Sequence, residues 1–278
     1  MSWMKSLLDF ALESRNNMEL GWIDSHAHIA SDPLFESFDE IVVRAQEMGI
    51  TKINIICGTL AEIERALSKV EGNPLFDLSV GAHPMELNSL QESELQAMEA
   101  YYTHPQVVCV GEIGIDYYWD DSYKAHQEAM LIRQIELANR YELPVAIHVR
   151  NEKDGSDAID DVIRIFKEHP VNHHGVIHCY TDSVENAKTL LDMGFYLGFG
   201  GVVTFKNGQN VRDALDVTPI NRILTETDSP YLAPVPMRGK QNEPGFVSYV
   251  GKHMNNHFGK DMREQLQENY KRLYTKTK

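Results

Sequence analysis

The sequence predicts a (β/α)8 barrel of the TIM type. Two observations support this fold: short β-branched runs alternate with amphipathic stretches about eight times, and 278 residues suffice for one barrel of that size. A doubly wound open sheet is the alternative, but neither a G-x-G-x-x-G turn nor a phosphate-binding G-x-x-x-x-G-K-[ST] motif is present. We expect residues 1–20 to be an N-terminal extension and residues 21–278 to form a single domain.

Eight runs are predicted as strands because they are short and rich in β-branched residues. They cover residues 22–26, 52–57, 76–83, 107–114, 144–149, 175–179, 195–200 and 222–228. Helical spacing of apolar residues predicts helices at 38–49, 122–143 and 183–194. Ser183 is the expected N-cap of the last of these, and Gly194 its end. Strands that alternate with helices in this way are expected to run parallel.

Composition limits the function. Lys and Arg number 26 against 41 Asp and Glu, so the net charge is −15. This charge argues against a broad basic face that grips duplex DNA, although metal ions and a few local cations can still neutralise a phosphodiester. The three cysteines have no paired spacing, which fits a reducing, cytoplasmic location. No apolar run is long enough to span a bilayer, and residues 1–20 make a poor signal peptide.

Polar, chemistry-bearing side chains gather at the predicted strand ends. In a barrel of this type, the active site lies at the carboxyl ends of the strands. The residues found at these ends are His26, His28, His83, Glu112, His148, His178 and Asp228. Each residue alone has an ordinary explanation, such as a core histidine bonded to a carbonyl, a buried ion pair or a capped turn. Many poorly paired polar groups at one end of a barrel would each carry a desolvation cost, so a shared metal site explains them better.

Four imidazoles and two carboxylates are too many for one tetrahedral ion, which favours two divalent ions a few Å apart. The first ion would take His26, His28 and Asp228, the second would take His148 and His178, and Glu112 would bridge them. Such a pair activates a water for hydrolysis, and Asp228 is placed to take its proton. Magnesium, manganese and zinc all remain open, because nitrogen-rich ligation suits some and carboxylates suit others.

The chain resembles the TatD family of metal-dependent deoxyribonucleases, within the amidohydrolase-like superfamily. The stretches that carry the resemblance are "SHAHI", "VGAHP", "GEIGIDY", "IHVR", "HCYTDS" and "LTETDSPYLAPVPMRGKQNEP". The resemblance implies a distorted TIM-type barrel, two divalent metals and 3′-to-5′ exonuclease action on DNA. The six predicted ligands coincide with the metal-binding positions of the family. Some relatives have been linked to RNA or to deacylation of tRNA that carries D-amino acids.

Two departures from the family pattern are visible: Thr181 and Asp182 replace the usual small Ser-Gly pair, and residues 1–20 precede the usual start. Beside the ligands, we expect His83 and Arg150 to contact substrate phosphate. The alternatives are that His83 only orders a loop and that Arg150 only pairs with a carboxylate.

Further candidates are weaker. The aromatic residues that follow the fourth strand could stack on bases, although such residues more often pack on the barrel rim; they are Tyr117, Tyr118 and Trp119. Arg238 and Lys240 either supply local positive charge or belong to a structural turn held by Glu243.

The main hypothesis is therefore a two-metal phosphodiesterase, a hydrolase that cleaves DNA ends or single strands through an activated water. We expect no membrane association and no obligate protein partner. The second hypothesis is an amidohydrolase or esterase that acts on a carbonyl substrate, such as a cyclic amide or D-aminoacyl-tRNA. The third is a metal-stabilised binding or scaffold protein.

Overall fold

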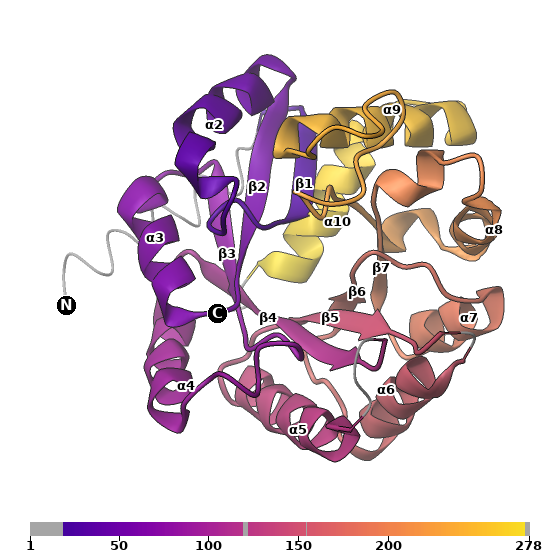
Figure 1. Cartoon of the computed structure of the whole chain (residues 1–278). Helices are drawn as coiled ribbons and strands as arrows, with labels where there is room; N and C mark the ends of the chain where they lie inside the picture. Colours follow the sequence, from indigo (N-terminus) through magenta and orange to yellow (C-terminus); the bar gives the residue numbers. More distant parts are fainter. Residues whose placement is uncertain (1–18, 119–121, 154, 276–278) are drawn as a thin grey trace.

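A computed structural model describes residues 19–118, 122–153 and 155–275, and it contains one sheet of eight strands (Figure 1). Each strand pairs in parallel with the next along the chain, in the order β1 to β8. The strands are β1 (Trp22–Ala27), β2 (Ile50–Cys57), β3 (Phe76–Val80), β4 (Val107–Asp116), β5 (Val145–Arg150), β6 (Gly175–Ile177), β7 (Tyr196–Phe199) and β8 (Ile223–Thr225). The predicted fold class, a (β/α)8 barrel, is confirmed.

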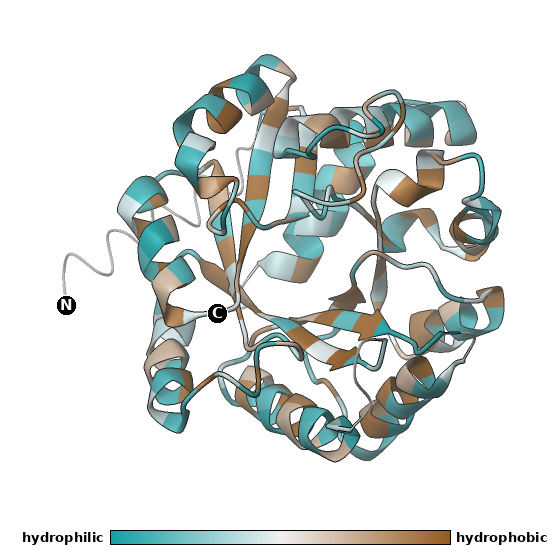
Figure 2. Ribbon diagram, in the orientation of Figure 1, coloured by the Kyte–Doolittle hydropathy of each residue, from teal (hydrophilic) through white to brown (hydrophobic). Residues whose placement is uncertain are grey.

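Helices surround the barrel and connect its strands. They are α2 (Phe38–Glu47), α3 (Leu60–Val70), α4 (Glu92–Glu99), α5 (Lys124–Arg140), α6 (Asp157–Glu168), α7 (Val184–Asp192), α8 (Gln209–Val217), α9 (Val247–Phe258) and α10 (Arg263–Tyr274). Short 3-10 turns lie at Phe35–Ser37, Ala100–Thr103, Gly201–Thr204, Ile220–Arg222 and Pro244–Phe246. Figure 2 shows apolar positions on the strands and on the helix faces toward them, with polar positions outside, as amphipathic helices require. Within the described residues, none of the helices combines the length and apolar character needed to cross a membrane.

The barrel closes between its last strand and its first, and this seam also builds the site. A parallel bridge joins Ala27 to Ser229. The Asp228 N–H donates to the His26 carbonyl at 2.9 Å, and the His28 N–H donates to the Ser229 carbonyl at 2.9 Å. The residues predicted to share one metal ion thus lie on two segments that are hydrogen-bonded to each other.

The end of the barrel opposite the mouth is filled by side chains. α10 lies behind the strands in the view of Figure 1, and its Tyr270, Leu273 and Tyr274 pack inside. They form a buried cluster with seven residues from six of the strands: Ile23, Val108, Cys109, Ala146, Val176, Tyr196 and Leu224. The closed end of the barrel is therefore a packed core, and the cavity opens at the mouth.

Three predicted strands extend two or more residues too far. The third was expected to reach His83, the sixth Cys179 and the eighth Asp228, but β3 ends at Val80, β6 at Ile177 and β8 at Thr225. Asp228 has a left-handed φ of 54°, which lies outside the extended region of a regular strand. The Ser183 N-cap is confirmed, since its hydroxyl accepts from the Asn186 N–H. The predicted N-terminal extension lies almost wholly outside the described residues.

Candidate metal centre

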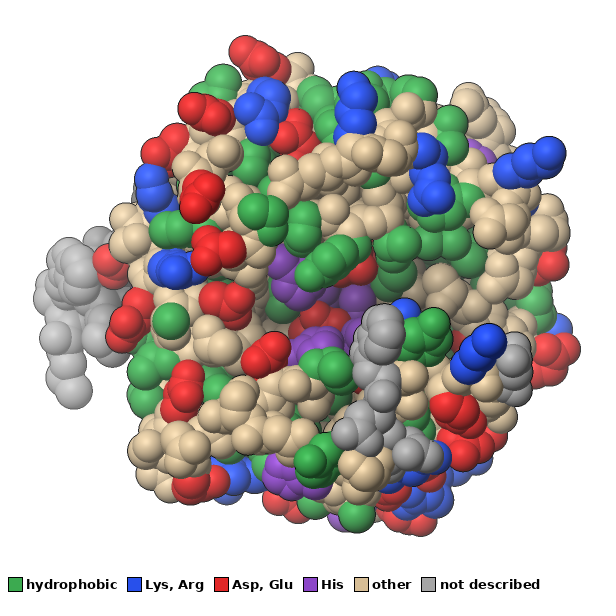
Figure 3. Space-filling view, in the orientation of Figure 1, with side chains coloured by type: hydrophobic (Ala, Val, Ile, Leu, Met, Phe, Trp, Pro, Cys, Tyr) green, Lys and Arg blue, Asp and Glu red, His purple; other side chains and the backbone are tan. Residues whose placement is uncertain are grey.

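The site is a hollow at the centre of the mouth, where Figure 3 shows histidines and acidic side chains at the bottom. The cavity has a volume of about 740 Å³, within the range of pockets that hold small ligands. Residues at or just past the ends of all eight strands line it. This is the location that the barrel architecture assigns to chemistry.

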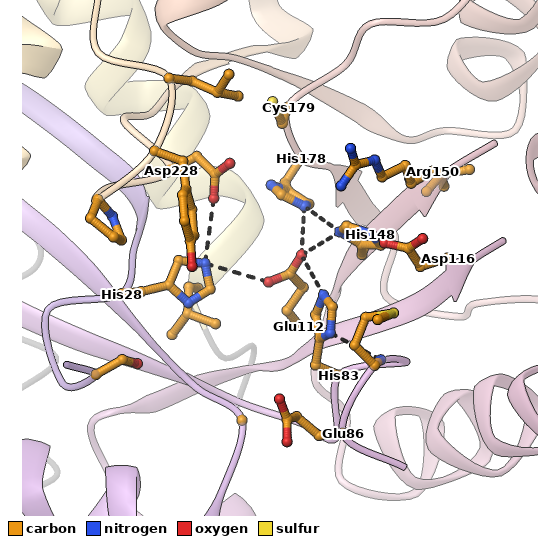
Figure 4. A pocket seen from close by; sticks show the side chains of 18 of the residues that line it. His28, His83, Glu86, Glu112, Asp116, His148, Arg150, His178, Cys179 and Asp228 are labelled. Carbon is orange, nitrogen blue, oxygen red and sulfur yellow. Dashed lines mark hydrogen bonds and ion pairs between the residues drawn. The ribbon is translucent and has the colours of Figure 1, made fainter. Parts of the chain in front are cut away.

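Glu112 lies at the middle of the site, and its two carboxylate oxygens face different histidines (Figure 4). Its Oε2 lies 3.3 Å from His26 Nε2 and 3.6 Å from His28 Nε2. Its Oε1 lies 2.6 Å from His178 Nε2 and 2.8 Å from His148 Nδ1. A carboxylate whose two oxygens face different pairs of histidines can contribute a ligand to each of two neighbouring metal positions.

His26, His28 and Asp228 form the first of these positions. His28 Nε2 lies 3.4 Å from Asp228 Oδ1, and His26 Nε2 lies 4.0 Å from the same oxygen. His26 lies on β1 and His28 one residue past its end, and this spacing of two brings their rings to the same side of the barrel wall. Asp228 comes from the seam, where its left-handed backbone turns its carboxylate toward them.

His148 and His178 form the second position, on β5 and directly after β6. Their facing nitrogens, Nδ1 of His148 and Nε2 of His178, lie 3.3 Å apart. The other nitrogen of His148 lies 3.0 Å from Asp116 Oδ2, so that carboxylate fixes the ring orientation. Asp116 is itself held, since its N–H donates to Gln127 Oε1 at 2.8 Å.

Electrostatics keep Glu112 ionised. Burial would raise the pKa of its carboxyl, but the surrounding histidines, His178 foremost, together hold that pKa well below its usual range. Burial also disfavours charge on His178, yet Glu112 raises the pKa of that imidazole to about 10. Burial, together with the nearby His178, lowers the pKa of His26 to about 4, so His26 stays neutral. Glu112 as a carboxylate and His26 as a neutral imidazole are therefore in the forms that bind metals, whereas His178 would release a proton when it binds one.

Two features of these side chains suit a metal ion: their donor atoms are of the types that metals prefer, and several of these atoms lack a hydrogen-bond partner in the part of the chain that the structure describes. Among the described residues, both ring nitrogens of His26 and Nδ1 of His178 are buried without a hydrogen-bond partner. Buried polar atoms seldom remain unpaired, and imidazole nitrogens are preferred metal ligands. Ligand atoms within 4.8 Å of one another occur in three groups: His26, His28 and Asp228; His83, Glu112 and His148; and His26, His178 and Glu226.

The predicted substrate contacts lie at the same cavity. His83 Nε2 is 3.6 Å from Glu112 Oε1, while its Nδ1 accepts from the Met85 N–H at 3.1 Å. The ring therefore both orders its loop and faces the centre. The Arg150 guanidinium lies 3.9 Å from the centre of the Tyr118 ring, and Arg150 lines the cavity.

The other sequence candidates have structural partners. Tyr117 is buried and donates to Asp161, so it is not available for stacking on a base. Arg238 lies over the Phe205 ring at 3.8 Å, and Glu243 pairs with Arg44. The expectation that Glu243 holds the turn of Arg238 and Lys240 therefore has no support in these contacts. Trp119 lies outside the described residues.

The departure at Thr181 and Asp182 has a visible consequence. Asp182 accepts from the Asn151 side chain at 2.7 Å, which ties the loop after β6 to the residue that follows Arg150. Asn210 donates to the Thr181 carbonyl at 2.7 Å. Thr181 lines the cavity, so this segment forms part of the wall around the centre.

Three buried carboxylates near the centre were not predicted from the sequence: Asp24, Asp116 and Glu226. Asp24 accepts from both the N–H and the hydroxyl of Thr227, which holds the seam together. Glu226 accepts from the Cys179 N–H and has an oxygen 3.9 Å from His178 Nδ1. Burial raises the pKa of Glu226 to about 8. Asp24 stands two residues from His26 on β1, and Asp116 four residues from Glu112 on β4. That spacing keeps strand residues on one face and could have revealed these two, whereas Glu226 lies past the end of β8.

A (β/α)8 barrel with histidines and carboxylates at its mouth defines the class of metal-dependent barrel hydrolases. The chain is 37% identical to a Bacillus subtilis protein, YabD, over 82% of this chain and 87% of that one. It is 35% identical to YcfH of Escherichia coli, over 84% and 86% of the two chains. Both are described as uncharacterized metal-dependent hydrolases.

The same class emerges from solved structures. The crystal structure of YjjV, a TatD homologue from Escherichia coli, superposes with a TM-score of 0.83 at 26% identity, covering 91% of this chain and 97% of that one. The family model described as "TatD related DNase" matches residues 23–275. The chain therefore belongs to the TatD family, and it is a metal-dependent hydrolase of that family.

Proposed function

We propose that the protein is a two-metal phosphodiesterase that degrades DNA, or single strands of it, from the 3′ end. The observation that carries the proposal is Glu112, whose two oxygens face two separate sets of histidines. The name of the matching family model, a TatD related DNase, supports DNA as the substrate.

His26, His28 and Asp228 would hold one divalent cation, His148 and His178 would hold the other, and Glu112 would contact both. Divalent cations at such a site lower the pKa of water and neutralise charge on a phosphodiester. Magnesium, manganese and zinc all suit this mixture of nitrogen and oxygen donors.

The residues of the chain then have separate roles. Asp228 Oδ1 is directed at His28, so we assign Oδ2 as the atom that takes the proton of the attacking water. His83 and Arg150 line the same cavity and would hold the phosphate, Arg150 through its planar fork. The Tyr118 ring against the guanidinium limits the positions that the fork can take.

Digestion of a 3′-labelled single strand with added Mg²⁺, Mn²⁺ or Zn²⁺ tests the proposal. Glu112→Gln removes the charge but keeps the shape, and we expect it to lower kcat by about 10³-fold or more. Glu92→Gln is the matched control, because Glu92 pairs with Arg133 on an outer helix. Equal and negligible activity of the wild type and Glu112→Gln with every metal would contradict a nuclease.

A carbonyl substrate is the second candidate, and the charge of the mouth favours it. Among the described residues that line the cavity, Arg150 is the one Lys or Arg, against six acidic residues: Asp32, Glu62, Glu86, Glu112, Asp116 and Asp228. Such a mouth suits an uncharged ester or amide. Comparing turnover of bis(p-nitrophenyl) phosphate with a panel of esters and amides separates the two candidates.

The proposal also covers the domain organisation and the cellular location of the protein. We propose that residues 21–278 act as one domain and that the protein works in the cytoplasm. Its three cysteines are free, and Cys179 lines the cavity, where oxidation would change the site.

A further inference from the structure

Exposed apolar side chains collect around the mouth of the barrel. Among the described residues, eight large hydrophobic side chains are exposed, and six of these lie on the loops that follow β3, β4 and β8. The six are Met85, Tyr118, Tyr123, Tyr231, Leu232 and Val235. Exposed apolar side chains that gather in one place, unlike scattered ones, indicate a contact surface.

Three of these residues, Met85, Tyr231 and Leu232, line the cavity itself, and we call them the apolar rim. Tyr231 leaves 63% of its surface exposed. Its backbone is nevertheless fixed, since its N–H donates to the Asp228 carbonyl at 3.0 Å and its carbonyl accepts from Asn242 at 2.6 Å.

The backbone of Met85 is anchored in a similar way, because its N–H donates to His83 Nδ1. Residues placed at the centre therefore hold the backbone of two rim residues. Met85 and Tyr231 thus lie at set positions relative to the centre.

The charge around the rim determines what can touch it. Asp32, Glu62 and Glu86 line the outer cavity, and the chain as a whole carries a net charge of −15. Phosphates that are not neutralised by the metal centre or by Arg150 would be repelled there. The faces of nucleobases are uncharged and stack well on tyrosine and aliphatic side chains.

We propose that the apolar rim binds the bases that adjoin the scissile phosphodiester. The protein therefore holds a strand end through its bases and through one or two phosphates, and does not track the phosphate backbone. This proposal rests on the proposed function, because it specifies how the same site recognises a nucleic acid. Its main consequence is weak dependence of binding on salt.

The test uses the metal-loaded protein and a 3′-labelled single-stranded oligonucleotide. Between about 50 and 200 mM salt, a protein that grips six or more phosphates loses roughly 10³- to 10⁵-fold in affinity. For one or two phosphates we expect KM to rise less than about tenfold over the same range. A rise of about a hundredfold or more overturns the proposal.

Variants of the rim provide a second readout. Tyr231→Ala is expected to raise KM about tenfold and leave kcat within about twofold, whereas Tyr231→Phe keeps the wild-type KM. Val235→Ala is the matched control, because Val235 is an exposed apolar residue of the same loop that does not line the cavity. Thermal unfolding of each variant checks folding.

The outcomes separate this inference from the proposed function. A strand that is cleaved with a steep salt dependence, or equally well by Tyr231→Ala, overturns the role of the rim and leaves the nuclease intact. A strand that is not cleaved with any metal overturns the proposed function, and the rim proposal with it.

Discussion

Charged side chains are buried at both ends of the barrel, but the two ends differ in how completely those side chains are paired. At the closed end, Lys52 and Asp77 are 2% exposed, with Nζ 3.4 Å from Oδ2. Lys52 also donates to the Pro74 carbonyl at 2.5 Å, and Tyr270 donates to Asp77 at 3.0 Å. The charges at the closed end are therefore matched by groups of the chain itself.

At the mouth, several buried polar atoms lack a hydrogen-bond partner within the described part of the chain. Both ring nitrogens of His26, Nδ1 of His178 and Oε2 of Glu226 have no hydrogen-bond partner among the residues that the structure describes. Unpaired buried polar atoms cost free energy, which a folded chain tolerates where the atoms serve a ligand. The contrast teaches that burial of charge alone does not mark a functional site; several incompletely paired ionisable groups gathered in one place do.

The largest expected change in stability lies at the closed end. Lys52→Met leaves the Asp77 carboxylate buried without its cation, and we expect the free energy of unfolding to fall by about 3–5 kcal/mol. The kcat of the folded protein should stay within about twofold, because the pair lies far from the mouth. Urea denaturation and activity at low temperature measure the two effects.

The double variant Lys52→Met/Asp77→Leu sharpens this prediction. Since both charges are then absent, part of the lost stability should return. A large fall in kcat in Lys52→Met, at full folding, would show that the closed end is coupled to the chemistry.

A smaller effect is expected at Glu226, whose carboxylate lies 3.9 Å from His178 Nδ1, which is too long for a hydrogen bond. We propose that the two groups close to hydrogen-bond distance when Nε2 of His178 holds a metal ion, so that Glu226 then orients the ring. Carboxylates that accept from a ligating imidazole typically improve metal affinity 10- to 100-fold, so Glu226→Gln should weaken it by about tenfold or more. Titration of the metal-free protein with Mn²⁺ or Zn²⁺ measures the affinity without any assay of activity.

Glu243→Gln is the control for this variant, since Glu243 pairs with Arg44 and not with a histidine of the centre. Wild-type metal affinity in Glu226→Gln, with a lower unfolding temperature of the metal-free protein, would limit Glu226 to a structural role.

Local patterns predict most of this architecture. Runs of β-branched residues locate all eight strands, because the strands of a parallel barrel are buried on both sides and keep a continuous apolar pattern. The strand ends then indicate His26, His28, Glu112, His148 and His178, which the structure brings together.

What the sequence does not reveal depends on contacts between distant segments. Asp228 was expected at the end of a strand, but it lies in a turn whose position depends on hydrogen bonds to β1. The pairing of Asp116 with His148 and the stacking of the Tyr118 ring on Arg150 likewise depend on how β4 and β5 lie side by side. No local pattern encodes such contacts.

The central claim is that the mouth is built for two divalent ions that share Glu112. The most direct measurement is metal analysis of the wild-type protein and Glu112→Gln, each stripped of metal and then titrated with Zn²⁺ or Mn²⁺. We predict two ions per wild-type chain and a marked loss of affinity at both positions in Glu112→Gln, with the metal-free proteins equally folded. One ion or none in the wild type, or two ions bound equally well without the Glu112 carboxylate, would contradict the account.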